Sequence, residues 1–539
     1  MSPIGLGLVL LAIAASALPL WLLKRSEAHS ARDWLVAPDR MRAQVVRNAS
    51  VATTMRSAVF VALFAAGASG EVWVVLAMSA SLGAGVYLVY LLRRPMLAHL
   101  DDALARDGSI SAIAFVGRRI GLDVRVRRLA AVLVLVVLMA VVLTEAFVLR
   151  WCFEQLLPDA SSLARALAAG VVVVAALQAM ASGHAAALHV AQFQFGLLYV
   201  GLFGSVVVLL YAQASTLLPL GRGDALMLAI GAATCVALVV KRRSRYVDTE
   251  TIRPPELSHA EPAPFASRVL RRAGKLINQI VSTLVVVAIV VAGMALYGAW
   301  SQGLRSSAPS AGGLPGWVVA VLCVVLLLHP VVDLAVWQQL AALRIRAGPT
   351  DLPGEEAEQR VRSTLHAHAL QSVALGLLMA MLGSLAAAVT GARGTDATLS
   401  TIASRLTVLD ADLGGTLLPC FVLTLLARAL TTMAPQFSAM LCTLRLDLWA
   451  GEGLVSWAGV GNLPGEERYR RKTQLAGLAL ACGVATVSAL VPFPGSTLGA
   501  AVIVLAVMGC GQLALLLASS HWRKRSSAGD AGTSSGQIR

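Results

Sequence analysis

The chain has 539 residues, of which 57% are hydrophobic and 14% are charged, and its formal net charge at pH 7 is +15. A mean hydropathy of +0.75 excludes a soluble globular protein. In a soluble chain this positive charge would indicate nucleic-acid binding. Here the basic residues stand in short loops between apolar segments, so we predict no nucleic-acid partner.

Thirteen apolar segments are long enough, at about twenty residues each, to cross a membrane as helices. This pattern predicts an all-α polytopic membrane protein. In chain order the predicted spans are 3–23, 48–68, 71–92, 129–149, 161–180, 188–211, 224–240, 276–298, 315–337, 366–390, 415–440, 474–491 and 497–518.

The basic residues lie mostly on one side of these spans. If consecutive spans alternate in direction, 36 of the 44 Lys and Arg residues fall on the same side. Basic loops stay in the cytoplasm, and anionic lipid at that face attracts them. We therefore predict a bacterial cytoplasmic (inner) membrane protein in contact with membrane lipid, with its N-terminus outside and its C-terminus inside. The loops assigned to the cytoplasm are 24–47, 93–128, 241–275, 339–365, 441–473 and the tail from 519.

Some extramembrane segments carry their own signals. Lys24 and Arg25 follow the first span rather than precede it, so we interpret that span as retained and not as a cleaved signal. The loop 241–275 opens with three basic residues and contains four prolines, and we expect it to be irregular and to offer a site for a protein partner. The tail 521–539 is rich in Ser and Gly and is predicted to be disordered.

The second span is the least helical in composition. Six of the ten residues in 48–57 are polar, at the cytoplasmic half of the span. Polar backbone at that depth is tolerated only where it lines a cavity or packs on protein, so we predict a broken helix. Arg56, within this run, costs about 2.5–3.5 kcal/mol to insert. It is either an internal cation, an anchor for a substrate carboxylate, or a side chain that reaches cytoplasmic water nine residues after Arg47.

Other ionisable residues stand inside predicted spans. Glu145 either pairs with Arg56 or Arg428, or lies at the outer boundary near Arg150. Arg428 is expected either to pair with another residue in the interior or to donate hydrogen bonds to backbone carbonyls. His184 and His189 are interpreted as core or loop residues rather than proton relays.

The ninth span contains a proline. Because Pro330, which follows His329, frees a backbone carbonyl four residues earlier, it predicts a break in that span.

Four stretches, in order along the chain, resemble the sodium/solute symporter family. The clearest is in the eleventh span, where Thr431-Thr432 is followed by Gln436 and, at the helix end, by Asp447-Leu448-Trp449. This is similar to the family's Ser-Thr pair, its Gln four residues on and its terminal Asp-Leu-Tyr. The other three stretches are 30–40, 115–121 and 333–339.

This resemblance implies a five-plus-five inverted repeat (the LeuT-like fold) with a preceding N-terminal helix. Two spans are inserted between the repeats, and two helices that normally follow the second repeat are absent. The implied divisions are an N-terminal helix and loop, a first repeat, two inserted helices with a basic loop, a second repeat and a tail, at 1–47, 48–217, 218–300, 301–520 and 521–539.

The resemblance also implies a sodium site. Thr431 and Thr432 match the family's hydroxyl ligands, and Ala52 and Met55 match the positions whose carbonyls bind the ion. Hard cations require such an oxygen cage. No other metal and no organic cofactor is expected. The residues assigned to substrate binding or to an internal cation are Arg56, Ser57, Glu145, Asp333 and Arg428.

Two departures from the family pattern oppose sodium coupling. Arg56 occupies a position beside the ion site where the family has a small residue. At 190–191 the chain has Val-Ala where the family has Thr-Asp, and that Asp supports the ion site. Two hypotheses therefore stand: sodium binds at Thr431 and Thr432, or Arg56 already supplies the positive charge.

The pattern favours a secondary active transporter that moves a small polar solute across the cytoplasmic membrane. The alternative is a transporter-like sensor or accessory membrane subunit that has lost sodium coupling. A membrane enzyme is not predicted. The adjacent carboxylate pairs 101–102, 355–356 and 466–467 all lie in basic loops, and the last two follow Leu-Pro-Gly, as solvated helix starts do.

Overall fold

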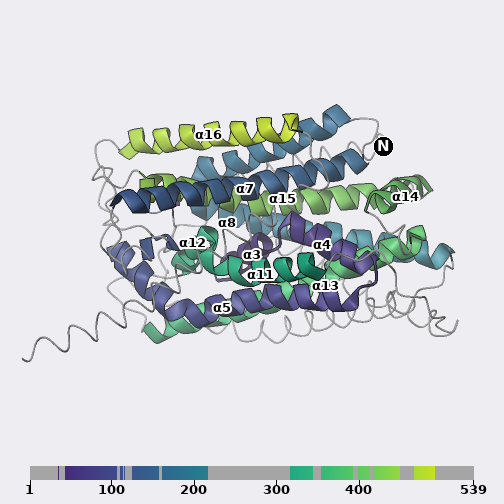
Figure 1. Cartoon of the computed structure of the whole chain (residues 1–539), viewed down its shortest axis with the longest axis horizontal. Helices are drawn as coiled ribbons and strands as arrows, with labels where there is room; N and C mark the ends of the chain where they lie inside the picture. Colours follow the sequence, from purple (N-terminus) through teal and green to yellow (C-terminus); the bar gives the residue numbers. More distant parts are fainter. Residues whose placement is uncertain are drawn as a thin grey trace, which may run out of the picture.

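The structure is a computed structural model, and it is all-helical over the residues that it describes. Those residues are 34–35, 43–105, 110–112, 114–115, 124–156, 161–216, 316–343, 354–392, 399–412, 415, 417–448 and 466–491. The helices are α3 (Ala43–Thr54), α4 (Ser57–Ala68), α5 (Val72–Ala105), α7 (Val124–Leu156), α8 (Ser161–Thr216), α11 (Gly316–Val332), α12 (Leu334–Leu343), α13 (Gly354–Thr390), α14 (Leu399–Asp412), α15 (Leu417–Thr443), the π-helical turn η3 (Leu444–Leu448) and α16 (Glu466–Leu490). The long helices lie side by side and run roughly along one direction (Figure 1).

The described residues contain up to nine segments that could span a membrane, if each bent helix pair is counted as one span. Seven helices are long and apolar enough to cross a membrane, and two further spans each consist of a bent helix pair. These nine match the second to sixth and the ninth to twelfth predicted spans. The other four predicted spans, the loop 241–275 and the C-terminal tail lie outside the described residues, so the total of thirteen remains a prediction.

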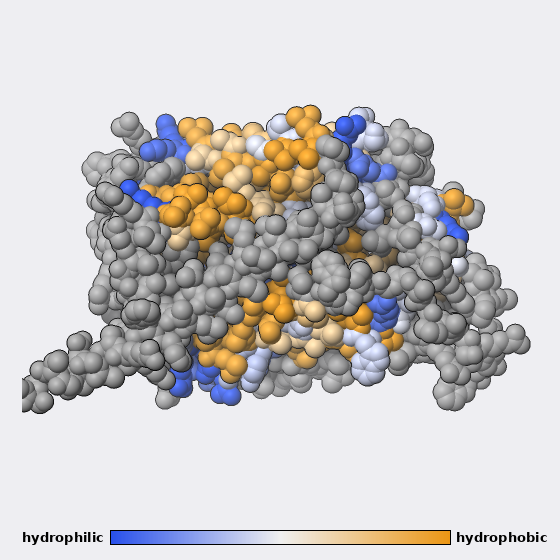
Figure 2. Space-filling view, viewed as in Figure 1, coloured by the Kyte–Doolittle hydropathy of each residue, from blue (hydrophilic) through white to orange (hydrophobic). Residues whose placement is uncertain are grey.

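The described surface suits a bilayer. Hydrophobic side chains cover the middle of the helices, and hydrophilic ones gather toward the helix ends (Figure 2). Among the large apolar residues, Trp73 is 83% exposed and Leu129 63% exposed. Apolar side chains this exposed along helices of membrane-spanning length face lipid rather than water. The chain is therefore a multi-pass helical membrane protein.

Two spans are broken, as the sequence predicts. The axis bends by 64° between α3 and α4 and by 45° between α11 and α12. At the first break Arg56 is extended, with φ −72° and ψ 157°. The second break falls at Asp333, three residues after Pro330. The predicted discontinuities of the second and ninth spans are confirmed.

The fifth and sixth predicted spans are two halves of α8. The helix changes direction at Gly183, whose φ of +75° is in the left-handed region. A Cβ at Gly183 would lie 2.5 Å from the Trp34 carbonyl oxygen, so this position also has no room for a side chain. The segment after the first predicted span therefore packs directly on the bend of α8.

The helices pack reciprocally. α4 packs on α13, and α11, which opens the other broken pair, packs on α5; α7 packs on α16 and α15 packs on α8. The described helices form two sets in chain order: α3/α4, α5, α7 and α8, and then α11/α12, α13, α15 and α16. If each member is replaced by its counterpart in the other set, with each broken pair taken as one span, the same contacts result. An inverted repeat produces this pattern. The repeat boundaries at 48–217 and 301–520 stay predictions.

The contact of α4 with α13 is unusually close. A Cβ at Gly67 would lie 1.9 Å from the Ala380 carbonyl oxygen, and one at Gly383 would lie 1.9 Å from the Phe64 carbonyl oxygen. Small residues allow this approach, which is how membrane helices gain packing energy without a hydrophobic drive.

The span pattern does not predict α14, which lies between the tenth and eleventh predicted spans. Asp410, near its end, accepts hydrogen bonds from the backbone N–H groups of Leu417 and Leu418 at 2.8 and 3.1 Å. The carboxylate thereby caps the first turn of α15. α14 thus fixes the start of the helix that carries the Thr431-Thr432 pair.

Candidate functional site

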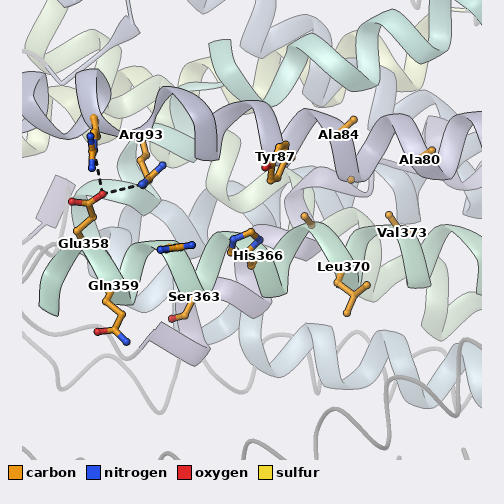
Figure 3. A pocket seen from close by; sticks show the side chains of 14 residues that line it. Ala80, Ala84, Tyr87, Arg93, Glu358, Gln359, Ser363, His366, Leu370 and Val373 are labelled. Atoms are coloured by element: carbon orange, nitrogen blue, oxygen red, sulfur yellow. Dashed lines mark hydrogen bonds and ion pairs between the residues drawn. The ribbon is translucent and has the colours of Figure 1, made fainter. Parts of the chain in front are cut away.

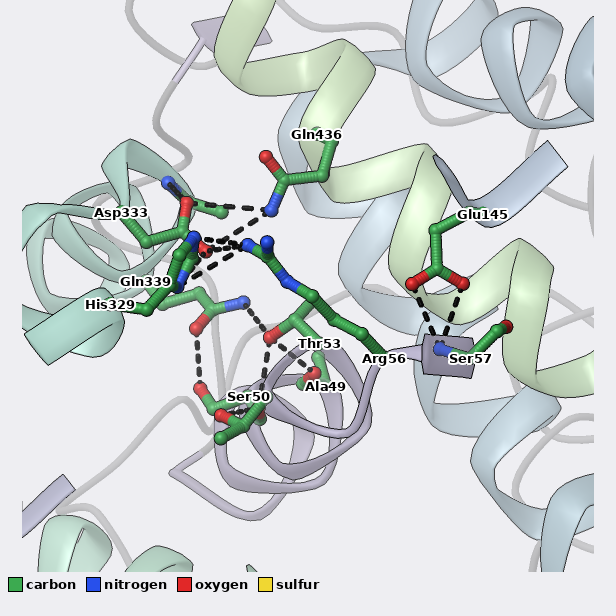
Figure 4. Close-up of polar contacts among 12 residues, drawn as sticks. Ala49, Ser50, Thr53, Arg56, Ser57, Glu145, His329, Asp333, Gln339 and Gln436 are labelled. Carbon is green, nitrogen blue, oxygen red and sulfur yellow. Dashed lines mark hydrogen bonds and ion pairs between the residues drawn. The ribbon is translucent and has the colours of Figure 1, made fainter. Parts of the chain in front are cut away.

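The two broken spans meet through Arg56. Its side chain is 10% exposed and points from the first break toward the second (Figure 4). Nη2 lies 3.4 Å from Asp333 Oδ2 and also contacts the imidazole of His329. The alternative in which Arg56 reaches cytoplasmic water does not fit this geometry. The guanidinium of Arg56 thus faces the carboxylate of Asp333 inside the helical bundle.

Asp333 is held by backbone and side-chain donors as well as by Arg56. Its carboxylate accepts a hydrogen bond from the N–H of Ala335 at 3.0 Å and from Gln436 Nε2 at 3.1 Å. His329 Nδ1 lies 3.6 Å from the same carboxylate. A carboxylate at this position caps the N-terminus of α12, where the helix dipole favours negative charge. Asp333 therefore joins α12 to both α15 and the first break.

Glu145 is the carboxylate that caps the helix after the first break. This residue of α7 is 1% exposed, and its two oxygens accept the N–H of Ser57 at 2.8 and 3.0 Å. It caps the N-terminus of α4, as Asp333 caps α12 (Figure 4). None of the predicted alternatives describes this contact. Glu145 forms no ion pair with Arg428 or Arg56 within 4 Å, and its side chain is buried among the helices.

Arg428 is fully buried on α15. Its Nη1 lies 3.9 Å from the sulfur of Met379, and its Cζ lies 5.7 Å from the ring centre of Phe60. Its Nε and Nη2 have no hydrogen-bond partner among the described residues. A cation over an aromatic face is stabilised electrostatically, but unpaired N–H groups in a buried site carry a desolvation cost. The predicted carboxylate or carbonyl contacts are absent from the described part of the chain.

The predicted sodium ligands are all buried. Thr431 and Thr432 each donate a hydrogen bond to the Arg428 carbonyl oxygen, at 2.7 and 3.2 Å. Hydroxyls in membrane helices commonly bond back to their own helix in this way, and their oxygen lone pairs remain available. Ala52 and Met55 are at the end of α3 and at the break, and α3 packs on α15. An ion cage formed by these four residues remains a prediction.

A second polar network holds α3 to α12. Ser50 donates a hydrogen bond to Gln339 Oε1 at 2.7 Å, and Gln339 Nε2 donates to the Thr53 hydroxyl at 3.4 Å. The Thr54 hydroxyl of the same helix lies 2.9 Å from His368 Nε2 of α13. The site assignment missed Gln339, Gln436 and His368. Both glutamines were visible within the family-like stretches, whereas no sequence signal marked His368.

The buried histidine His184 packs near the bend of α8. Its Nδ1 lies 3.0 Å from the Ser438 hydroxyl, and it is fully buried. Gln338 donates a hydrogen bond to the Leu35 carbonyl oxygen at 3.0 Å in the same region. This is the environment of a core histidine. The side chain of His189 lies outside the described residues.

The four charged groups at or beside the two breaks balance. Counted as formal charges, Arg56 and Arg428 are two positive groups, and Asp333 and Glu145 are two negative groups. Uncompensated charge inside a membrane protein is costly, so buried ionisable groups there normally pair with one another. By this formal count, the four described groups at the breaks sum to zero.

Two discontinuous helices whose polar breaks meet inside a helical bundle occur in several secondary-transporter folds. Among solved structures, the chain is similar to a Na⁺-coupled sialic acid symporter in a substrate-bound, outward-open state. The identity is 12% and the TM-score 0.56, over 96% of this chain and 87% of that chain. At this identity the similarity establishes the fold. No family model and no curated protein sequence matches the chain.

Proposed function

We propose that the protein is a secondary transporter that moves a small polar solute across the cytoplasmic membrane by alternating access. The observation that carries this proposal is the direct contact between the two broken spans, Arg56 to Asp333, with α15 joined through Gln436. In transporters of this architecture, the solute is held where discontinuous helices expose backbone and polar groups at the midplane. The shared fold with a symporter supports the same proposal. Membership of the sodium/solute symporter family, with sodium ligands at Thr431 and Thr432, stays a hypothesis.

The interior offers polar atoms for such a solute. Among the described residues, Gln436 Oε1 and the Nε and Nη2 atoms of Arg428 are buried without hydrogen-bond partners. Buried polar atoms are almost always satisfied, by protein, by water or by a ligand. Both residues are on α15. A solute with hydrogen-bond donors and acceptors would satisfy these atoms.

We further propose that transport does not require sodium. The formal charges of the four buried groups at the breaks sum to zero, and the described residues contribute no further carboxylate there to balance a bound cation. The Val-Ala pair at 190–191 agrees with this, since the family's supporting Asp is missing. The competing hypothesis remains a sodium ion at Thr431 and Thr432, which needs only neutral oxygen ligands.

A second candidate function is a transporter-like sensor or accessory subunit. The observation that favours it is that the carboxylates at both breaks are already bonded by the chain itself: Asp333 by Ala335 and Gln436, and Glu145 by Ser57. Such a site is well suited to hold one conformation. Solute movement across a membrane separates the two functions.

Solute counterflow in proteoliposomes tests the proposal. Purified full-length protein is reconstituted in vesicles preloaded with a candidate solute, and entry of the radiolabelled solute is followed. A panel of N-acetylneuraminic acid, proline, glucose, pantothenate and acetate covers the chemistries suggested by the fold and by the family resemblance. We expect protein-dependent exchange of at least one solute, lost in Arg56→Ala. Solute binding without exchange would favour the sensor.

A further inference from the structure

A cavity of about 1070 Å³ lies between α5 and α13, away from the two breaks (Figure 3). The two helices run antiparallel along it, because Arg93 faces Glu358 at one end and Ala80 lies beside Val373 at the other. One end is charged and the other is apolar. This volume is at the upper limit of ordinary small-molecule pockets, which suits an extended ligand.

The apolar end is lined by small and aliphatic side chains. Gly83 and Ala84 of α5 face Leu370 and Val373 of α13. A Cβ at Gly83 would lie 2.5 Å from Val373 Cγ2, so the floor of the groove is closed by direct helix contact. Leu370 remains 42% exposed, so the groove is open along its side. An unbranched hydrocarbon chain fits such a channel.

The charged end holds three arginines and one carboxylate. Glu358 accepts hydrogen bonds from Arg93 at 2.9 Å and from Arg94 at 3.4 Å. Arg362 lines the same cavity and has no hydrogen-bond or ion-pair partner within the described ranges. Nε of Arg93 is buried and also unpartnered there. One carboxylate leaves two positive charges uncompensated, so this end favours an anion with several acceptor oxygens.

Aromatic rings mark the transition between the two ends. Tyr90 and His366 lie 4.6 Å apart between ring centres, and the guanidinium of Arg93 lies 4.2 Å above the ring of Tyr90. Tyr87 is 45% exposed at the same level. Tyrosines gather at membrane–water interfaces, where the polar and apolar parts of lipids meet. From Tyr87 to Ala80 the helix rises about 10 Å, within the roughly 15 Å of one leaflet.

We propose that this groove binds one anionic phospholipid. The phosphate lies against Arg362, Arg93 and Arg94, and one acyl chain lies along Ala84 and Leu370. The order of groups along the groove is the order within the lipid: charge first, then aromatic rings at the interface, then a narrow apolar channel. The arginines begin the predicted cytoplasmic loop 93–128, which places the headgroup in the inner leaflet, where anionic lipid attracts basic residues.

Lipid-dependent thermal stability of the purified full-length protein tests the proposal. Delipidated protein in detergent is titrated with phosphatidylglycerol, with phosphatidylcholine carrying the same acyl chains, and with soluble glycerol 1-phosphate. We expect saturable stabilisation by phosphatidylglycerol at an apparent Kd about 25-fold lower than that for phosphatidylcholine, because two uncompensated arginines should each contribute about fivefold. Glycerol 1-phosphate should have no effect, because it lacks the acyl chain.

Matched variants locate the site. Arg362→Gln should raise the apparent Kd for phosphatidylglycerol about fivefold, the effect of one interfacial arginine. Arg360→Gln, on the same helix but outside the cavity lining, should leave it unchanged. Ala84→Phe should weaken binding by filling the channel, whereas Ala77→Phe, equally on α5 but outside the lining, should not.

Three outcomes would overturn the proposal. Equal stabilisation by both phospholipids would remove the requirement for an anion, and equal stabilisation by glycerol 1-phosphate would leave only a phosphate site. Loss of stability of Ala84→Phe in lipid-free detergent, with an unchanged phosphatidylglycerol response, would show that the chain itself fills the groove. Solute exchange is measured separately, so none of these results bears on the transport proposal.

Discussion

The guanidinium of Arg56 lies 3.4 Å from the carboxylate of Asp333, and this contact connects the break of one membrane span to the break of the other. Each break is also capped by a carboxylate, Asp333 for α12 and Glu145 for α4. The two broken spans are thus held by charges that originate in the chain itself. The stability of the bundle and the proposed transport cycle both depend on this arrangement.

Removing one member of the Arg56–Asp333 pair should destabilise the protein more than removing both. Arg56→Gln leaves a buried carboxylate without its cation, and Asp333→Asn leaves a buried guanidinium without its anion. We expect each to lower the free energy of unfolding by about 3–5 kcal/mol. The double variant Arg56→Gln/Asp333→Asn should recover a large part of that loss. Thermal unfolding of the four proteins in detergent measures this double-mutant cycle.

Arg94→Gln is the matched control for this cycle, because the Arg94 side chain is 78% exposed and its pairing with Glu358 lies at the surface. Exposed pairs contribute roughly 0–1 kcal/mol. Purely additive effects of Arg56→Gln and Asp333→Asn would show that the two charges are not energetically coupled.

Glu145→Ala should weaken the start of α4. The carboxylate accepts the Ser57 N–H with both oxygens, and a hydrogen bond to a charged group contributes about 1.5–3 kcal/mol. Glu145→Gln retains one acceptor and should cost less. Thr144→Ala serves as the control, since that hydroxyl bonds only to the Ala140 carbonyl of its own helix at 2.7 Å. Chemical denaturation in mixed micelles compares the three; equal losses for Glu145→Ala and Thr144→Ala would refute the capping role.

Gly183→Ala should destabilise the bend of α8. The residue has φ +75°, and an added methyl group would meet the Trp34 backbone. A non-glycine residue in a sparsely populated conformation costs about 1–3 kcal/mol, before any displacement of Trp34. Gly170→Ala, also in α8, meets nothing within 4 Å and should be neutral or stabilising, because alanine favours helix. A melting temperature of Gly183→Ala at or above that of Gly170→Ala would contradict the assigned geometry.

The predicted topology places the loop containing Ser307 outside and the loop containing Ser258 in the cytoplasm. This orientation is predicted because 36 of the 44 basic residues fall on the side assigned to the cytoplasm. Fusions to alkaline phosphatase at Ser307 and to green fluorescent protein at Ser258 should both be active. Reversed activities would exclude the predicted orientation and, with it, a headgroup site in the inner leaflet.

The sequence was sufficient to predict the membrane class, the nine described spans and the two breaks. A long apolar segment has few structural alternatives to a membrane-spanning helix. A polar run such as 48–57 inside such a segment indicates non-helical backbone. The second break was predicted near Pro330 and found three residues later at Asp333. There the carboxylate caps the new helix, which a proline alone does not indicate.

The partners of the buried charges were not predictable in the same way. Asp333 lies 277 residues after Arg56, and Glu145 lies 88 residues after Ser57. Local periodicity carries no information about such pairs, because they depend on how the helices pack. Sequence reasoning offered Arg56 or Arg428 as a partner for Glu145, but it predicted neither the contact of Arg56 with Asp333 nor that of Glu145 with the Ser57 N–H.

Sodium replacement in the counterflow assay tests the central claim most directly. Exchange of the transported solute is measured with sodium or choline as the only monovalent cation, for the wild type, Arg56→Ala and Thr432→Ala. We expect equal exchange by the wild type in both cations, because Arg56 already balances the buried charge, and loss of exchange by Arg56→Ala in both. Exchange that requires sodium, is unaffected by Arg56→Ala and needs more sodium in Thr432→Ala would contradict the account.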